Sequence, residues 1–409
     1  MKLLTDEQLW HYFSGMWAGF EEPDHAMRVL DEGDARPEAE CRPLVRATLP
    51  NYTSAWLVTG YRECVSLLSD PVFRRCPSEH QETSGPASPI GELLSGIDPP
   101  RHTRLRGLVA RAFAARKVET MRPVLERRVA RHLAAVDLES GTTVDLYRRF
   151  CLPLASETTF AITGFPAEFH AATSAWAHKV LVQSDFSTPE FARLAREQVD
   201  LVEAIIAAKR RSPGSDVLTD LIGFCDRDGL ITEAELRAMV ASLPVSGHVK
   251  GAMQLAAMLL ILLNRPNDLE RLRREPSLIP TALQEMLRYA PVPAHLLPRF
   301  PARDLEFGGT VVKAGEALFP AVFAANHDPA VFDTPHRLDL RRKGERPLTF
   351  GHGAHFCLGT HLMQLMMTIA LEQVLEPLAA CHAGAPADHA DWITGGTAHG
   401  VVGLTATLP

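Results

Sequence analysis

Residues 350–359 read Phe-Gly-His-Gly-Ala-His-Phe-Cys-Leu-Gly, and this stretch decides which fold the chain is expected to adopt. Glycines at 351, 353 and 359 let the backbone turn sharply and approach a flat partner more closely than a side chain would allow. Cys357 stands just before an apolar run that is typical of a helix. At a helix N-terminus the free N–H groups and the positive end of the dipole favour the thiolate, which is the form of cysteine that binds metal. The stretch therefore predicts a thiolate ligand.

Cys357 offers a single sulfur atom. Iron–sulfur clusters and structural zinc sites take several cysteines at short spacing, whereas the other cysteines are scattered at 41, 64, 76, 151, 225 and 381. A lone thiolate in a glycine-bounded loop suits an axial ligand to a metal that a macrocycle already holds. The alternative is a buried free cysteine in a glycine-rich turn, which leaves the remote motifs below unexplained.

The stretch resembles, position for position, the heme-binding loop of the cytochrome P-450 superfamily, Phe-Gly-x-Gly-x-His-x-Cys-Leu-Gly. The resemblance implies that Cys357 is the proximal iron ligand of heme b, iron protoporphyrin IX. It also implies that Phe350 packs beside Cys357, that His355 lies near a heme propionate, and that Gly359 borders the cofactor. The fold implied is mainly α with a smaller β region, the triangular helical heme protein of that family, as a single domain over residues 1–409.

Composition is compatible with such a protein. The 409 residues are 46% hydrophobic and 22% charged, which is enough to bury a large core. The net charge of −7 and the lack of a basic tail argue against a nucleic-acid partner. Seven scattered cysteines favour a reducing compartment, and the longest apolar run, Leu255 to Leu263, is too short to span a bilayer. We therefore expect a cytoplasmic protein with no membrane partner.

Candidate propionate ligands lie in the segment 98–106, Asp-Pro-Pro-Arg-His-Thr-Arg-Leu-Arg, which opens a predicted helix. His102 and Arg106 are four residues apart and share one helical face, so both can reach one anion. The resemblance assigns them to a heme propionate and gives Arg299 the same role. The alternative is a solvated basic helix, because other arginines crowd the same segment.

A second pair of charged residues, Glu285 and Arg288, lies on one helical face at a spacing that allows a bidentate ion pair. Such a pair is by itself common on protein surfaces. The residues that follow continue the family pattern, and the resemblance implies a structural network of Glu285 and Arg288 with Arg337.

The substrate pocket is implied by resemblance alone. It is expected to be lined by Ser246, Ala294, His295 and Leu296. A histidine that is merely packed or linked to solvent is the alternative to a chemical role for His295.

The longest predicted helix runs from Thr232 to Leu263 and begins with a capping box, Thr232-Glu-Ala-Glu235. Its middle, Gly247-His-Val-Lys250, resembles the family's long helix on the distal side of the heme, and we take these four residues as the catalytic stretch. Where the family usually has an acid and then an alcohol, which deliver protons during oxygen activation, this chain has Val249 and Lys250. A valine cannot relay a proton, and an ammonium accepts none. We therefore expect atypical oxygen activation.

The sequence leaves several roles open for the amine of Lys250. Its aliphatic stem would let the amine reach solvent away from the heme. If the amine instead points over the heme, an enclosed ammonium is costly. It would then pair with an anionic substrate group, donate a proton at the iron, or lose its proton and ligate the metal. We favour pairing with a carboxylate or another anion.

The function expected is a heme-thiolate oxidoreductase, like a P-450 monooxygenase, that acts on a small or medium organic molecule in specialised metabolism. The alternatives are a peroxide-using enzyme, a non-oxygenating enzyme that catalyses rearrangement, dehydration or bond formation, and a degenerate heme-binding module that recruits a partner. A ferredoxin-type electron donor is expected to dock on basic residues near the heme loop, unless these form only a solvated surface. They are Arg104, Arg111, Arg341, Arg342, Lys343 and Arg346.

Local patterns also predict secondary structure. The expected elements are a strand at Ala55–Val58, helices at 63–68, 118–136, 144–160 and 190–208, a hairpin at 307–315, a helix after the heme loop and a strand at 400–407.

Overall fold

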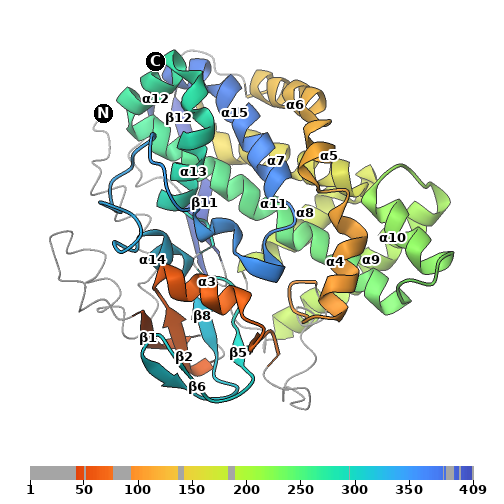
Figure 1. The fold of residues 1–409 in the computed structure, drawn as a ribbon. Coiled ribbons are helices and arrows are strands. Elements are labelled where there is room, and N and C mark those ends of the chain that lie inside the picture. The colour runs from red at the N-terminus through yellow and green to blue at the C-terminus, as the bar shows by residue number, and fades with distance from the viewer. Residues whose placement is uncertain are drawn as a thin grey trace.

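Helices form most of the body of the computed structural model, and small sheets gather mainly at one edge, at the lower left of Figure 1. The mainly α fold with a smaller β region is thereby confirmed. The structure describes residues 43–49, 52–76, 94–136, 142–182, 189–293, 295–380, 382–383, 391–395 and 398–407.

The helices pack around one of their number, α11, which runs through the middle of the molecule (Figure 1). Their bounds are α3 Tyr61–Ser69, α4 Arg101–Ala110, α5 Ala115–Glu119, α6 Arg122–Ala134, α7 Leu152–Thr163, α8 His170–Val182, α9 Pro189–Arg211, α10 Val217–Asp226, α11 Glu233–Asn264, α12 Pro266–Arg274, α13 Ile279–Tyr289, α14 Val322–Asn326 and α15 Thr360–Ala380. A π-helical stretch, Tyr147–Cys151, leads into α7, and short 3-10 helices lie at Ala167–Phe169, Pro276–Leu278, Leu348–Phe350 and Gly353–His355.

Helix α11 begins with the predicted capping box. The N–H of Glu235 donates to the Thr232 hydroxyl at 3.2 Å, and the Glu235 carboxylate accepts the Thr232 N–H at 3.1 Å. By length and composition α11 would pass as a membrane span, but 88% of its apolar window is buried inside the protein. A helix that is apolar on all sides and covered by other helices is a core helix.

Two glycines let neighbouring helices approach α11 closely. A Cβ on Gly247 would lie 3.2 Å from Cγ2 of Thr159 in α7, and a Cβ on Gly251 would lie 2.7 Å from Sδ of Met363 in α15. Four-residue spacing puts both glycines on one face of the helix. Because α15 begins just after Cys357, this packing helps to hold the cysteine loop near the middle of α11.

The sheets are short and mostly antiparallel. The strands are β1 Leu44–Leu49, β2 Tyr52–Val58, β3 Phe73–Arg74, β4 Thr143–Asp145, β5 Phe300–Pro301, β6 Leu305–Phe307, β7 Thr310–Val312, β8 Leu318–Pro320, β9 His382–Ala383, β10 Asp391–Gly395, β11 Ala398–Gly403 and β12 Thr405–Thr407. They pair as β1-β2-β8, β3-β5, β6-β7, β4-β12-β9 and β10-β11. Strand β8, which follows Arg299 in the chain, runs parallel to β2, with Leu57 opposite Phe319. The chain after Arg299 therefore lies beside the first sheet.

Several predicted elements are confirmed: β2, α3, α9, the β6–β7 hairpin and α15. The single helix predicted over 118–136 is wrong, because the structure has α5 and α6 there. Pro123, in the first turn of α6, has no N–H to donate to the carbonyl of Glu119, so the ladder breaks between the two helices.

Two further predictions are wrong because strands form where the sequence suggested another structure. The helix predicted from residue 144 begins later, because Thr143–Asp145 forms β4 and pairs with β12. The strand predicted over 400–407 is two strands in different sheets, since β11 pairs with β10 whereas β12 pairs with β4 and β9. In both cases a partner distant in sequence decided the structure.

Candidate active site

Cys357 lies in a tight loop between a 3-10 helix and α15. Its N–H donates to the carbonyl of Phe350 at 2.9 Å, and its own carbonyl accepts the Thr360 hydroxyl at 2.8 Å. Gly353 has a φ of 68°, and a Cβ there would lie 2.3 Å from the carbonyl oxygen of Leu68 at the end of α3. Only glycine fits this combination of left-handed backbone and close approach. The loop is thus fixed against α3 with Cys357 at its C-terminal end.

The surroundings of Cys357 act on its thiol in opposite directions. Burial raises the pKa of the thiol, although the N–H of Gly359, the Thr360 hydroxyl and the charges of Arg106 and Lys250 all act to lower it. The helix end therefore acts in the predicted direction, towards thiolate, and burial acts against it. A bound cation would supply the missing stabilisation of the thiolate.

His102 and His355 come together from distant parts of the chain. Their rings lie 4.0 Å apart between centroids, tilted by 34°. His102 is buried, and neither of its ring nitrogens has a hydrogen-bond partner among the residues that the structure describes. Buried polar groups are normally hydrogen-bonded, so these nitrogens suit a group that the chain itself does not provide.

The other residues around this histidine pair are cationic. Burial lowers the pKa of His355 to about 2, and the charges of Arg299, His102, Arg75 and Arg106 lower it further. Burial also lowers the pKa of Arg299 to about 10, opposed by the carboxylate of Asp98. Among the described residues of this cluster, the Asp98 carboxylate stands against the guanidinium groups of Arg75, Arg106 and Arg299, so positive charge is in excess.

Helix α4 divides its basic residues between two faces. The Arg106 guanidinium donates to the Phe356 carbonyl at 2.6 Å and so reaches the cysteine loop. Arg101 and Arg104 turn instead to the carboxylate of Glu235 at the start of α11, the former at 3.2 Å. The predicted common face of His102 and Arg106 is consistent with this division.

Arg75 is a member of the cluster that the sequence analysis did not identify. Its N–H donates to both oxygens of Asp98 at 2.9 Å, and its buried guanidinium donates to the carbonyls of Ser95, at 2.7 Å, and Pro298. It follows strand β3, which pairs with β5 next to Arg299. Only this pairing of distant strands reveals it, because Arg75 has no local motif.

These residues fit heme. Cys357 offers one sulfur, a Cβ on Gly359 would meet nothing within 4 Å, and the histidine–arginine cluster suits two carboxylates. The residues that would hold the propionates are His102, Arg106, Arg299 and His355, with Arg75 in support. We call them the propionate cradle.

On α11, the four residues of the predicted catalytic stretch have different surroundings. Gly247 faces Thr159 of α7, and His248 is buried with its ring 5.4 Å from that of Phe160. Burial lowers the pKa of His248 to about 4, helped by His178 of α8 and opposed by the Pro244 carbonyl. Val249 is only 1% exposed and belongs to the hydrophobic core. Three of the four residues are therefore engaged in helix packing.

Lys250 is the member of that stretch that interacts electrostatically with Cys357. Burial lowers the pKa of Lys250 to about 8, and the thiol of Cys357 opposes this shift. The same interaction lowers the pKa of Cys357. The amine and the sulfur are therefore coupled electrostatically.

The predicted pocket residues can be placed only in part. The side chain of Ser246 and the whole of residue 294 lie outside the described residues. Leu296 donates its N–H to the Pro320 carbonyl at 3.0 Å, and its Cδ1 lies 3.4 Å from where a Cβ of Gly351 would be, so it borders the cysteine loop. The His295 ring packs edge-on against Phe319 at 5.1 Å.

The predicted ion-pair network is present with one correction. Glu285 and Arg288 form two bonds of 2.7 and 2.8 Å, and both side chains are 1% exposed. The second guanidinium on Glu285 is that of Arg342, at 3.0 Å, whereas Arg337 takes part through its carbonyl oxygen, which accepts from Arg288 at 3.2 Å. A turn that bonds the Arg342 N–H to the Asp339 carbonyl brings Arg342 back to the network.

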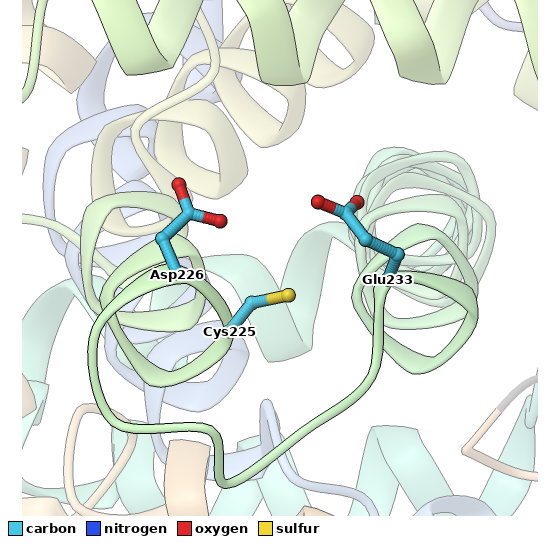
Figure 2. Close-up of side chains that lie close together, drawn as sticks. All are labelled: Cys225, Asp226 and Glu233. Carbon is cyan, nitrogen blue, oxygen red and sulfur yellow. The ribbon is translucent and has the colours of Figure 1, made fainter.

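A separate cluster, Cys225, Asp226 and Glu233, has ligand atoms within 4.8 Å of one another (Figure 2). The guanidinium of Arg210 already pairs with both carboxylates, at 2.6 Å from Asp226 and 2.5 Å from Glu233. The cluster therefore joins α9, α10 and α11 as an ion-pair network, and we assign it no metal.

Comparisons with known proteins show which family this chain is similar to. A family model described as Cytochrome P450 matches residues 188–379. Nocardicin C N-oxygenase of Nocardia uniformis subsp. tsuyamanensis is 33% identical over 92% of this chain and 95% of its own. The 6-deoxyerythronolide B hydroxylase of Saccharopolyspora erythraea is 33% identical over 83% of this chain and 86% of its own. Among solved structures, HinD with NMFT and NO has a TM-score of 0.83 at 36% identity, and covers 91% of this chain and 96% of its own. A myxobacterial cytochrome P450 in complex with myristic acid has a TM-score of 0.85 at 28% identity, over 98% of both chains.

Proposed function

The chain belongs to the cytochrome P450 family, and from that premise we propose that it oxidises a small or medium organic molecule of specialised metabolism by an atypical route of oxygen activation. The heme-dependent, monooxygenase-like character follows from the family. The observation that carries the proposal is the combination of the Cys357 loop with the propionate cradle opposite an α11 that lacks the acid–alcohol pair.

Bound heme supplies an iron centre that activates oxygen, with electron density pushed from a thiolate ligand. Cys357 would hold the iron, and the propionate cradle would hold the carboxylates and fix the orientation of the ring. Arg106 connects the two, since it lies in the cradle and donates to the Phe356 carbonyl next to Cys357. Leu296 would exclude water beside the loop.

The atypical part of the proposal rests on Val249 and Lys250. Val249 is packed in the core and has no group that could hold a proton. Lys250 carries donors and no acceptor while it is protonated. Protons would then reach the site from ordered water or from the substrate itself. The same observation favours a second candidate function, a peroxide-using or non-oxygenating reaction, which needs no proton relay on α11.

A role as a degenerate heme-binding recruitment module is less well supported. Cys357 and the propionate cradle retain the groups that the resemblance assigns to the cofactor, and the relatives named above are an oxygenase and a hydroxylase. We infer that the protein acts in the cytoplasm in specialised metabolism, as an enzyme.

The electron donor is proposed to be a ferredoxin-type protein, but on a smaller basic surface than the sequence suggested. Arg341 pairs with Glu275 at 2.6 Å, Arg342 is committed to Glu285, and Arg104 is committed to Glu235. Lys343 and Arg346 are exposed on the segment that leads to the cysteine loop. We therefore place the donor's contact on these two residues.

The test begins with the reduced protein under carbon monoxide, which should show the strongly red-shifted Soret band of thiolate ligation. Cys357→Ser should lose that band and the activity with it, while Cys225→Ser, in the separate cluster on α10, should keep both. A Cys357→Ser variant with the parent spectrum would contradict the proposal. Substrate turnover supported by ferredoxin and its reductase, compared with turnover supported by peroxide, then separates the two candidate functions.

A further inference from the structure

Gln254 is a buried polar residue of α11 that the predicted site does not include. It lies one turn after Lys250, on the same face of the helix. Its amide nitrogen Nε2 donates to the carbonyl of Ala290 at 2.8 Å, and its amide oxygen Oε1 accepts the N–H of Val292 at 3.1 Å. One side-chain amide therefore satisfies a backbone acceptor and a backbone donor two residues apart in the segment that follows α13.

That segment has few backbone donors of its own. Prolines at 291 and 293 have no N–H, so Val292 provides the single backbone donor between them. The N–H of Ala290 donates to the Met286 carbonyl at 3.0 Å, and the carbonyl of Val292 accepts the His399 N–H at 2.9 Å. With the two bonds to Gln254, every backbone donor and acceptor of Ala290 and Val292 has a partner, as buried backbone requires.

Strand β11 meets α11 at the same place. His399 belongs to β11, and a Cβ on the neighbouring Gly400 would lie 3.0 Å from Cβ of Met253, the residue before Gln254. The backbone of β11 therefore packs directly on this turn of α11. Gln254 thus joins α11 to a segment that β11 also holds through a backbone bond.

Within a few residues the segment reaches the cysteine loop. Leu296 donates its N–H to a carbonyl of β8 at 3.0 Å, and its Cδ1 lies 3.4 Å from where a Cβ of Gly351 would be. Residues 290–296 therefore run from α11 to the loop that carries Cys357. The bonds of Gln254 and of Leu296 fix the two ends of the chain that contains the predicted pocket stretch.

We propose that Gln254 is a positioning residue that sets the shape of the substrate site by holding residues 290–296 at a fixed place beside α11. This inference rests on the proposed function and adds to it a residue that determines how bulky substrates fit. Without the amide, a buried carbonyl and a buried N–H would lose their partners, which is costly, so the segment would shift to satisfy them. A bulky ligand of the iron would then have to order this wall of the site on binding, whereas a small ligand would not.

The test uses the purified holoenzyme and two ligands of ferric heme, imidazole and 4-phenylimidazole, whose binding is followed by heme absorption. Imidazole reports access to the iron, and the phenyl ring of 4-phenylimidazole reports the wall around it. Gln254→Met keeps the length of the side chain and removes the amide. Because two buried bonds are lost, it should weaken 4-phenylimidazole binding by about fivefold or more and leave imidazole binding unchanged.

Gln254→Asn is the second variant, and it applies also if Gln254→Met does not fold. It keeps a polar amide but shortens the side chain by one methylene, so that the amide cannot reach both the Ala290 carbonyl and the Val292 N–H. It should also weaken 4-phenylimidazole binding selectively. A role in stability alone would not separate the two ligands.

Asn264→Leu is the matched control, because Asn264 is another buried amide of α11, and it donates to the Leu260 carbonyl at 2.9 Å within the helix. It should leave the ratio of the two affinities unchanged. An unchanged ratio in both Gln254 variants would overturn the inference, and so would the same selective loss in Asn264→Leu. The carbon monoxide spectrum of the parent separates these outcomes from failure of the proposed function: without the red-shifted band the function fails, and with it only the role of Gln254 fails.

Discussion

The Cys357 loop and the middle of α11 match the motifs of the family resemblance to different degrees. In the loop, the matching residues are held by backbone geometry, such as the Cys357 N–H on the Phe350 carbonyl and Gly353 against Leu68. In α11, Gly247 and Gly251 pack against neighbouring helices, while Val249 and Lys250 stand where the resemblance leads us to expect an acid and an alcohol. Gly353 cannot gain a side chain without altering the shape of the loop. The helix can carry other side chains at positions 249 and 250 and still pack through its glycines. Residues that determine the reaction can therefore change while the helix packing stays the same.

The largest effect is expected from a substitution in the propionate cradle, on the same side of the site as the Cys357 loop. Arg299→Leu removes a buried cation from the propionate cradle and should accelerate heme loss by about tenfold or more, since a charge-assisted hydrogen bond contributes about 1.5–3 kcal/mol. Transfer of heme to apomyoglobin, followed by absorption, measures the rate. The exposed neighbour Arg303→Leu is the control. Equal rates in both variants would remove Arg299 from the cradle.

The next largest effect is expected on α11. Val249→Glu restores the family's acid in sequence, but Val249 is in the core, so the new carboxylate should lower stability by about 1–3 kcal/mol or more instead of restoring a relay. Thermal unfolding measures this, with Val249→Ile as the control for altered shape. A Val249→Glu variant as stable as the parent, with tighter coupling of oxygen use to product, would show that this position does face the site.

A pH-dependent effect should come from His248. Its pKa is lowered from 6.5 to about 4 in the folded protein, so the unfolded chain takes up its proton first as the pH falls. Above pH 6.5 the ring is neutral in both states and does not change the free energy of unfolding. Between pH 6.5 and 4 that free energy decreases, by about 2 kcal/mol at pH 5. His248→Leu should therefore become more stable relative to the parent between pH 7 and pH 5.

Unfolding temperatures of parent and His248→Leu at the two pH values test this, and exposed His361→Leu provides the background. A difference between parent and His248→Leu that does not change with pH would mean that His248 is not kept neutral by burial.

The smallest effect concerns the electron donor. Reversing the charge of Lys343 and Arg346 should slow reduction by an acidic ferredoxin a few-fold at low salt, and high salt should erase the difference. Stopped-flow reduction is the measurement. Arg341→Glu should have less effect on docking, because Glu275 already neutralises Arg341. If Arg341→Glu is the slower variant, the docking surface lies elsewhere.

What the sequence determined by itself is local. The Cys357 loop, the capping box at Thr232 and Glu235, and the shared face of His102 and Arg106 depend on spacing within one turn or loop, where short-range backbone geometry leaves few alternatives. The heme-protein family follows from the loop because many specific positions occur together in it.

Only the tertiary structure decided which distant groups meet. Arg75 lies in the cradle because β3 pairs with β5. A turn places Arg342, and not the side chain of Arg337, beside Glu285. Strand β12 pairs with β4, in a different sheet from β11. The faces of His248, Val249 and Lys250 likewise depend on how α7, α8 and α15 pack on α11. Such contacts cost chain entropy that long-range packing has to offset, and no short stretch of sequence contains the information on which partner it will find.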